Sequence, residues 1–228
     1  MKIITIDGPS GVGKGTISRW LARTLGWAWL DSGALYRLVA YQAQQYQIDP
    51  TDAVRLAQAA AALAVVFGIE EGDEPSVTLD GQVVTRAIRT EECGVLASKI
   101  SAHPEVRQAL LEKQRAFLSP QGLVADGRDM GTVVFTEAPV KIFLQARADV
   151  RALRRQHQLQ KQGLNVNIAA LLQEIEARDE RDRTRAVAPL IPAKDALIID
   201  TSDLTIEQVC QTALAAVGRV FDTAQGPV

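Results

Sequence analysis

The chain contains few of the residues on which metal centres and nucleophilic active sites are usually built. Its 228 residues include two cysteines, Cys93 and Cys210, and two histidines, His103 and His157. The cysteines do not form a CxxC pair, and lone cysteines of this kind are more often buried thiols. We therefore expect neither a structural zinc site nor a Ser-His-Asp or Cys-His catalytic set.

The chain also lacks a strong charge of either sign and a long apolar run. Its net charge is −2 with 23% charged residues, so nothing favours general binding to nucleic acids. The apolar run at residues 1–6 is too short for a signal peptide, and the alanine-rich run at residues 57–68 is too short to span a membrane. We expect a cytoplasmic, monomeric protein that binds small molecules, without nucleic-acid or membrane partners.

Short apolar segments of strand character alternate with longer helical patterns. Pro104 suits the first turn of a helix, and Asn167 can cap the N-terminus of another. Such alternation predicts an α/β fold in which a parallel sheet has helices on both faces. The strand-like segments are residues 2–7, 27–30, 123–125, 140–144 and 196–199, and the helical patterns are residues 16–25, 104–118, 149–161, 168–185 and 206–221.

Two segments interrupt this alternation. Within residues 62–88, two short strand patterns flank Asp80 and Gly81, a strong signal for a two-residue hairpin turn. We expect a small antiparallel insert there, although an ordinary surface excursion of the chain would give a similar sequence pattern. Residues 156–167 are polar, carry Gly163 and lie between two helical patterns, which is typical of a mobile lid.

A glycine-rich turn follows the first strand and opens a helix. Its glycines allow several backbone N–H groups to point at one anion, and the N-terminus of the helix adds the positive end of its dipole. Lys14 can bring a full charge to the phosphates of a nucleotide, and Thr16 can bind Mg²⁺ directly or through water. The turn consists of Gly8, Pro9, Ser10, Gly11, Val12, Gly13, Lys14, Gly15 and Thr16.

This phosphate-binding loop does not by itself identify a reaction. A small-molecule kinase, a nucleotide-dependent regulatory switch and a purely structural α/β domain all remain open. A GTPase switch usually carries the tetrapeptide Asn-Lys-x-Asp after a later strand, and the chain has no such tetrapeptide. A motor ATPase usually has a strand that ends in Asp-Glu, whereas here the corresponding strand ends in Asp126-Gly127.

Three further segments offer groups for a second anion. Ser32 can cap a helix that begins near Ala34, with Arg37 on its first turn, and the Asp-Gly-Arg-Asp sequence at residues 126–129 follows a buried strand. In residues 178–185, four arginines and several acids share a helix. Solvated arginines, a charged turn and surface ion pairs are the ordinary alternatives. Grouped arginines can also neutralise a phosphoryl group during transfer.

Together these segments resemble the bacterial cytidylate kinases of the P-loop nucleoside monophosphate kinase superfamily. The resemblance rests on residues 4–16, 31–37, 126–135 and 178–189, in the order and spacing of that family. It implies one domain over residues 1–228 with a parallel five-stranded sheet, an acceptor-binding insert at residues 62–97 and a lid at residues 156–167. It also implies transfer of the γ-phosphoryl group of ATP to CMP or dCMP with Mg²⁺. A kinase of another acceptor, such as shikimate, gluconate or dephospho-coenzyme A, is the nearest alternative.

The resemblance implies roles for individual residues. Lys14 belongs to the donor side with Arg154 and Arg155, and Thr16 and Asp126 would hold Mg²⁺, Asp126 through water. Lys14, together with Arg128 and Arg185 of the acceptor side, would stabilise the phosphoryl group during its transfer. The acceptor residues are Ser98, Arg107 and Asp129 for cytosine, Arg178 and Asp182 for the pentose, Ser10, Arg37, Arg128 and Arg185 for the α-phosphate, and Ser32 as a further substrate-binding position.

Overall fold

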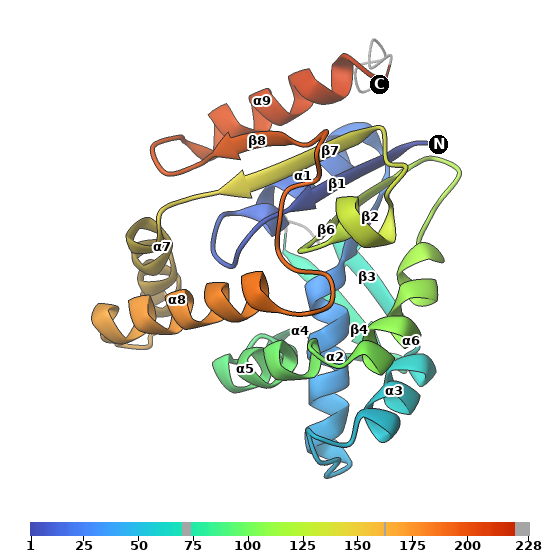
Figure 1. The fold of residues 1–228 in the computed structure, drawn as a ribbon. Coiled ribbons are helices and arrows are strands. Elements are labelled where there is room, and N and C mark those ends of the chain that lie inside the picture. Colours follow the sequence, from blue (N-terminus) through green and yellow to red (C-terminus); the bar gives the residue numbers. More distant parts are fainter. Residues whose placement is uncertain (70–73, 162, 222–228) are drawn as a thin grey trace.

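The computed structural model describes residues 1–69, 74–161 and 163–221 (Figure 1). Its main sheet has five parallel strands in the order β2-β6-β1-β7-β8, which confirms the predicted sheet. The strands are β1 (Ile3–Asp7), β2 (Ala28–Asp31), β6 (Leu123–Gly127), β7 (Val140–Gln145) and β8 (Leu197–Asp200).

The central strand, β1, positions the site. All five of its residues are buried, since strands flank it on both sides and helices cover both faces of the sheet. Its register places Asp7 beside Gly127 of β6 and Phe143 of β7. The carboxyl ends of parallel strands share one edge of the sheet, so the loops that follow Asp7 and Gly127 lie next to each other.

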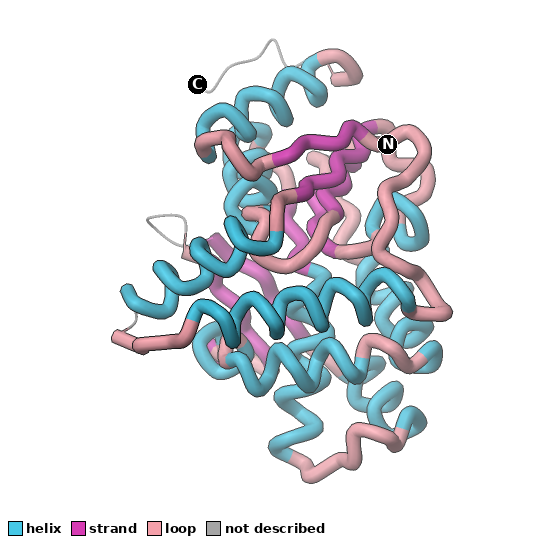
Figure 2. The backbone as a smooth tube through the Cα atoms, turned by 60° about the vertical axis from the view of Figure 1, so that its left-hand side comes forward, coloured by secondary structure: helices cyan, strands magenta, loops and turns pink. Residues whose placement is uncertain are grey.

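Helices cover the two faces of this sheet (Figures 1 and 2). Successive residues of β1 point to opposite faces, so Ile3 joins one buried cluster and Ile4 and Ile6 join the other. The helices are α1 (Lys14–Leu25) and α9 (Ile206–Gly218) beside Ile4 and Ile6, and α2 (Ser32–Gln45), α3 (Ala53–Ala62) and α6 (Pro104–Arg115) beside Ile3.

The predicted antiparallel insert is present as a three-stranded sheet. In the hairpin turn, Asp80 has a φ of 49° and Gly81 a φ of 79°, both in the left-handed region that a tight two-residue turn requires. Residues 70–73 lie outside the described part of the chain. The insert contains β3 (Val65–Ile69), β4 (Pro75–Leu79), β5 (Gln82–Val83), α4 (Thr85–Ile88) and α5 (Glu91–Ile100).

Two helices, α7 (Ala148–Lys161) and α8 (Ile168–Thr184), pack on each other through Ala152, Leu159 and Leu171. The segment at residues 156–167 therefore comprises the end of α7 and the connection to α8, with residue 162 outside the described part. Asn167 caps α8 as predicted, its Oδ1 accepting from the amide of Ala169 at 2.8 Å.

The predicted cap of α2 is wrong by one residue. Asp31 is the N-cap, and its Oδ1 accepts from the amide of Ala34 at 2.9 Å. Ser32 is the first residue of the helix, and its hydroxyl donates to Oε1 of Gln114 at 2.9 Å. The cap therefore comes from the last residue of β2, which the sheet already holds in extended conformation.

Past β6, the chain forms a π-helical turn, η2 (Met130–Val134), close to the end of β1. In the described residues, none of the helices combines the length and the apolar character needed to cross a bilayer.

Candidate active site

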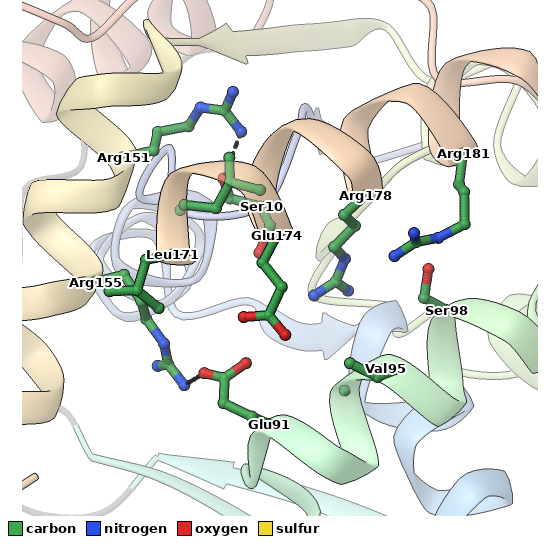
Figure 3. Close-up of a pocket in the computed structure, with 13 residues that line it drawn as sticks. Ser10, Glu91, Val95, Ser98, Arg151, Arg155, Leu171, Glu174, Arg178 and Arg181 are labelled. Atoms are coloured by element: carbon green, nitrogen blue, oxygen red, sulfur yellow. Dashed lines mark hydrogen bonds and ion pairs between the residues drawn. The ribbon is translucent and has the colours of Figure 1, made fainter. Parts of the chain in front are cut away.

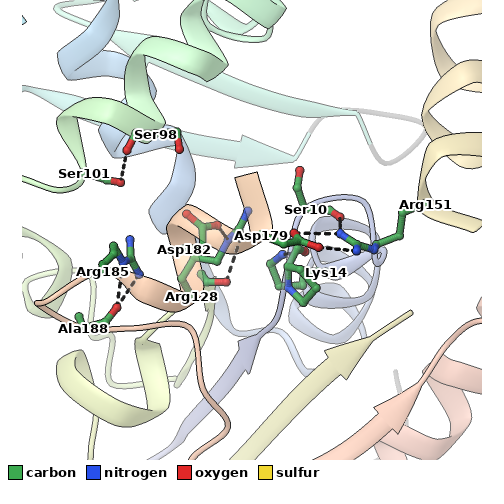
Figure 4. A network of polar contacts seen from close by, with 12 residues as sticks. Ser10, Lys14, Ser98, Ser101, Arg128, Arg151, Asp179, Asp182, Arg185 and Ala188 are labelled. Carbon is green, nitrogen blue, oxygen red and sulfur yellow. Dashed lines mark hydrogen bonds and ion pairs between the residues drawn. The ribbon is translucent and has the colours of Figure 1, made fainter. Parts of the chain in front are cut away.

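The glycine-rich loop packs against the end of β7. A Cβ atom on Gly8 would lie 2.1 Å from the carbonyl oxygen of Leu144, so no other residue fits there without moving the backbone. Gly13 has a φ of 96° and forms the N-cap of α1. The first residue of that helix is Lys14, whose Nζ donates to the carbonyl of Pro9 at 2.7 Å within the same loop (Figure 4).

Lys14 lies among other cations. Burial lowers the pKa of its ammonium group well below the usual range, and the next cause is repulsion from Arg128. Arg178 lowers this pKa further, whereas Asp126 and Asp7 raise it. The lysine and the two arginines come from different elements and converge on the same edge of the sheet, where an anion would relieve their repulsion.

The arginines of the acceptor side form a cluster around one carboxylate. Nε of Arg128 donates to Oδ2 of Asp182 at 2.9 Å (Figure 4). Burial, followed by repulsion from Arg128, lowers the pKa of Arg178 to about 10, and Arg37 and Arg181 add to this repulsion. Nε of Arg178 is buried and has no hydrogen-bond partner among the described residues. The cluster therefore has more positive charge than its own carboxylate can compensate.

Two more arginines surround this cluster. Arg37 donates to the carbonyl groups of Ile88 and Thr90 at 2.8 and 3.1 Å, which ties α2 to the insert. Arg185 donates to the carbonyl of Ala188 at 2.6 Å, and burial followed by repulsion from Arg107 lowers the pKa of Arg185. Both guanidinium groups are thus held by backbone oxygen atoms, and within the described part of the chain neither forms an ion pair.

A buried ion pair adjoins the cluster. Arg107 of α6 pairs with Asp129, and both side chains are less than 10% exposed. The Arg107 guanidinium also donates to the carbonyl of Ser101 at 3.2 Å, and its central carbon lies 5.6 Å from the centre of the Tyr36 ring. Fixed donors and acceptors of this kind can recognise the polar edge of a base.

A pocket lies between the glycine-rich loop and the insert (Figure 3). Ser98 of α5 and Arg178 of α8 reach it from opposite sides, and Ser98 Oγ is a second buried polar atom without a partner in the described residues. Ser10 of the loop and Arg155 of α7 also line it. Unpartnered buried donors beside a pocket are expected where a polar ligand supplies the missing acceptors.

The structure also reveals a positively charged residue that the sequence did not single out. Arg151 of α7 is buried, and it donates at 3.1 Å to both the carbonyl of Ser10 and Oδ1 of Asp179. It thereby joins the glycine-rich loop, α7 and α8. The sequence feature that could have singled out Arg151 is its spacing, since it lies three and four residues before Arg154 and Arg155 and therefore on the same helical face.

Comparisons with known proteins identify the family of the chain. The family model for cytidylate kinase matches residues 4–219. A protein named cytidylate kinase from Yersinia enterocolitica is 53% identical over 219 residues, which is 96% of this chain and 95% of the relative. One from Colwellia psychrerythraea is 56% identical over 212 residues, 93% of this chain and 94% of the relative. The chain belongs to the cytidylate kinase family.

Among solved structures, a gluconokinase from Sinorhizobium meliloti 1021 superposes with a TM-score of 0.49 at 17% identity. The match covers 98% of this chain and 95% of that one.

The two arginines that the cytidylate kinase resemblance assigned to the donor, Arg154 and Arg155, make different contacts. Arg154 donates to Oγ1 of Thr201 at 3.0 Å, and that hydroxyl donates to the carbonyl of Val12, so Arg154 adjoins the glycine-rich loop. Arg155 instead reaches across the pocket to the insert, where it pairs with Glu91 (Figure 3). This pair directly bridges α7 and α5.

The two candidate metal-binding residues differ in exposure. Thr16 is exposed on the first turn of α1, whereas Asp126 is buried, and its Oδ2 accepts from Ser18 Oγ at 2.5 Å and from Trp29 Nε1 at 3.0 Å. Burial is the main reason that the pKa of Asp126 rises to about 6, while Lys14 lowers it. A hydroxyl and a carboxylate are the oxygen ligands that Mg²⁺ prefers, so the donor set fits that ion.

Proposed function

We propose that this member of the cytidylate kinase family transfers the γ-phosphoryl group of ATP to CMP and dCMP, giving ADP with CDP or dCDP. The observation that carries the proposal is the convergence of Lys14 with Arg128 and Arg178, whose repulsion adds to burial in lowering the pKa of Lys14. One anion held by the glycine-rich loop and a second held by the arginine cluster would face each other there.

The reaction needs no nucleophilic side chain, because a phosphate oxygen of the acceptor attacks the γ-phosphorus in line. The loop and Lys14 steady the donor. Arg128, Arg185 and the arginines of α7 reduce the repulsion between two anions and stabilise the transferring group. Closing α7 and its connection to α8 over the site would exclude water and limit hydrolysis of ATP.

Selection of cytosine is assigned to the buried pair of Arg107 and Asp129, together with the unpartnered hydroxyl of Ser98. Cytosine differs from uracil in the donors and acceptors on its polar edge. A site built to satisfy that edge leaves buried groups unpaired when uracil binds, which is a strong basis for discrimination.

Mg²⁺ is the cofactor that we propose beside ATP. Thr16 and, through water, Asp126 would hold it, and the hydrogen bonds from Ser18 and Trp29 to Oδ2 fix the orientation of the Asp126 carboxylate. Bound there, the ion would neutralise charge on the donor phosphates.

The direct test is a steady-state assay of ADP release with ATP and each of the four ribonucleoside monophosphates. We expect kcat/KM for CMP to exceed that for UMP by at least about tenfold, with dCMP also accepted and purines close to background. Shikimate and gluconate belong in the same panel, and a reaction without acceptor measures hydrolysis. Faster turnover of either acid than of CMP, or ADP release independent of any acceptor, would overturn the proposal.

The pair of Glu91 and Arg155 gives a second test, on the donor side. If Arg155 must leave Glu91 to meet the phosphates of ATP, the Glu91→Gln substitution should lower KM for ATP by about two- to fivefold, since partly exposed ion pairs contribute up to about 1 kcal/mol. Glu92→Gln, which changes another exposed glutamate on the same turn, is the control. An unchanged KM in Glu91→Gln would mean that this pair does not compete with ATP.

A further inference from the structure

A buried carboxylate lies at the end of β1 and has no role in the mechanism above. Asp7 is 5% exposed and is the last residue before the glycine-rich loop. Its Oδ1 accepts from the amide of Met130 at 2.9 Å, and its Oδ2 accepts from the amide of Gly131 at 2.8 Å. Both oxygens are thus used to hold the segment that follows Arg128 and Asp129.

These amides are the first of the π-helical turn, which have no partner inside the turn. Asp129 is the N-cap residue, and an aspartate at that position ordinarily accepts from such amides with its own side chain. Here Asp129 makes no capping hydrogen bond, and its carboxylate is turned to Arg107. Asp7 supplies from another strand the acceptors that the cap residue does not.

We propose that Asp7 is a positioning residue for the acceptor, which holds the amides of Met130 and Gly131 so that Asp129 can face Arg107 and Arg128 can face the acceptor phosphate. The inference rests on the proposed function, because it takes the roles of Asp129 and Arg128 from there. In this arrangement β1 leads into the glycine-rich donor loop and, through Asp7, also supports the loop that carries the acceptor residues.

The packing around Gly131 agrees with this role. A Cβ atom on Gly131 would lie 2.9 Å from Oγ1 of Thr5 and 3.4 Å from Oδ2 of Asp7, so the turn approaches β1 as closely as a glycine allows. A side chain at that position would push the turn away from the carboxylate.

The charge of Asp7 is costly in this buried position. Burial raises the pKa of its carboxyl to about 7, although the amides of Gly131 and Met130 and the charge of Lys14 oppose that rise. The ionised form is therefore less favourable here than in water. Neutral asparagine would avoid this burden, but it has a single acceptor oxygen and would leave one of the two amides without a partner, so the carboxylate is the side chain of this shape that accepts from both.

The test is the Asp7→Asn substitution. The side-chain oxygen of asparagine can still accept from one of the two backbone amides, while its NH₂ group is placed against the other amide N–H, where two donors face each other. We expect the Kd for CMP, measured by calorimetry without ATP, to rise about tenfold, and the preference for CMP over UMP to fall by a similar factor. KM for ATP should change less than about twofold. Ile142→Val, in the core of β7, is a matched control that should leave all three values unchanged.

Gly131→Ala is a second variant that keeps the carboxylate and moves the turn instead. It should weaken CMP binding and selectivity as Asp7→Asn does, and it covers the case in which Asp7→Asn folds poorly. Equal losses of affinity for CMP and ATP, or unchanged CMP binding in both variants, would overturn the inference. Wild-type protein that does not turn over CMP would instead overturn the proposed function, so the two failures are distinct.

Discussion

Replacing Lys14 with alanine is expected to lower kcat by about 10²–10³-fold, which corresponds to about 3–4 kcal/mol in the barrier. Its ammonium group lies inside the glycine-rich loop, 2.7 Å from the carbonyl of Pro9, and a bound phosphate would give it a charged partner. Alanine preserves the backbone amides of the loop, so some affinity for ATP should remain. The loss should fall on the transfer step, which a single-turnover assay at saturating ATP measures.

The same substitution should not destabilise the fold. Burial, followed by repulsion from Arg128, lowers the pKa of Lys14 below its ordinary value of 10.5. A basic group whose pKa is lower in the folded than in the unfolded state destabilises the fold. The full effect is present below the folded-state pKa, and it disappears as the pH rises to the unfolded-state pKa. We therefore expect an equal or higher unfolding midpoint at pH 7.5. The control is Lys2→Ala, which removes an exposed lysine just before β1 and should change neither kcat nor the unfolding midpoint. Near-normal turnover of the Lys14→Ala variant would contradict a role for Lys14 in phosphoryl transfer.

The second large effect is expected from the Asp129→Asn substitution. It leaves the charge of Arg107 buried without a counter-charge, and breaking a pair in this way typically costs about 3–5 kcal/mol. Arg107→Met should cost a similar amount by leaving Asp129 unpaired. The double variant should recover part of the loss, since no buried charge is then left alone. Urea unfolding of the four proteins gives the coupling energy of the pair.

The same variant should also lose selectivity. We expect Asp129→Asn to lower the ratio of kcat/KM for CMP to that for UMP by about tenfold or more, with KM for ATP nearly unchanged. Activities with CMP and UMP that decline by the same factor would show that Asp129 stabilises the fold without reading the base.

Local chemistry made much of this architecture predictable. β1 reads as a strand buried on both faces because it lacks polar alternation, and a lysine after a glycine-rich turn at its end has few uses other than phosphate binding. The hairpin at Asp80 and Gly81 depends on two residues that tolerate a positive φ. The start of α6 at Pro104 and the cap of α8 at Asn167 each depend on a single residue.

The features that sequence did not predict depend on distant contacts. Arg151, Arg154 and Arg155 share a helical face, and only the packed neighbours decide that the first is buried against Asp179 while the last reaches Glu91. Asp31 and Ser32 are both good caps, and the choice follows from where β2 ends. The role of Asp7 depends on amides more than a hundred residues away.

The order of the strands has a consequence for the newly made protein. β1 is translated first, yet its two neighbours in the sheet are residues 123–127 and 140–145. At about 5–20 residues per second, a ribosome needs roughly 7–30 s to reach the end of the second neighbour. During that interval the nascent chain carries an apolar strand without partners, and the nucleotide site cannot form until more than half of the polypeptide has been synthesised.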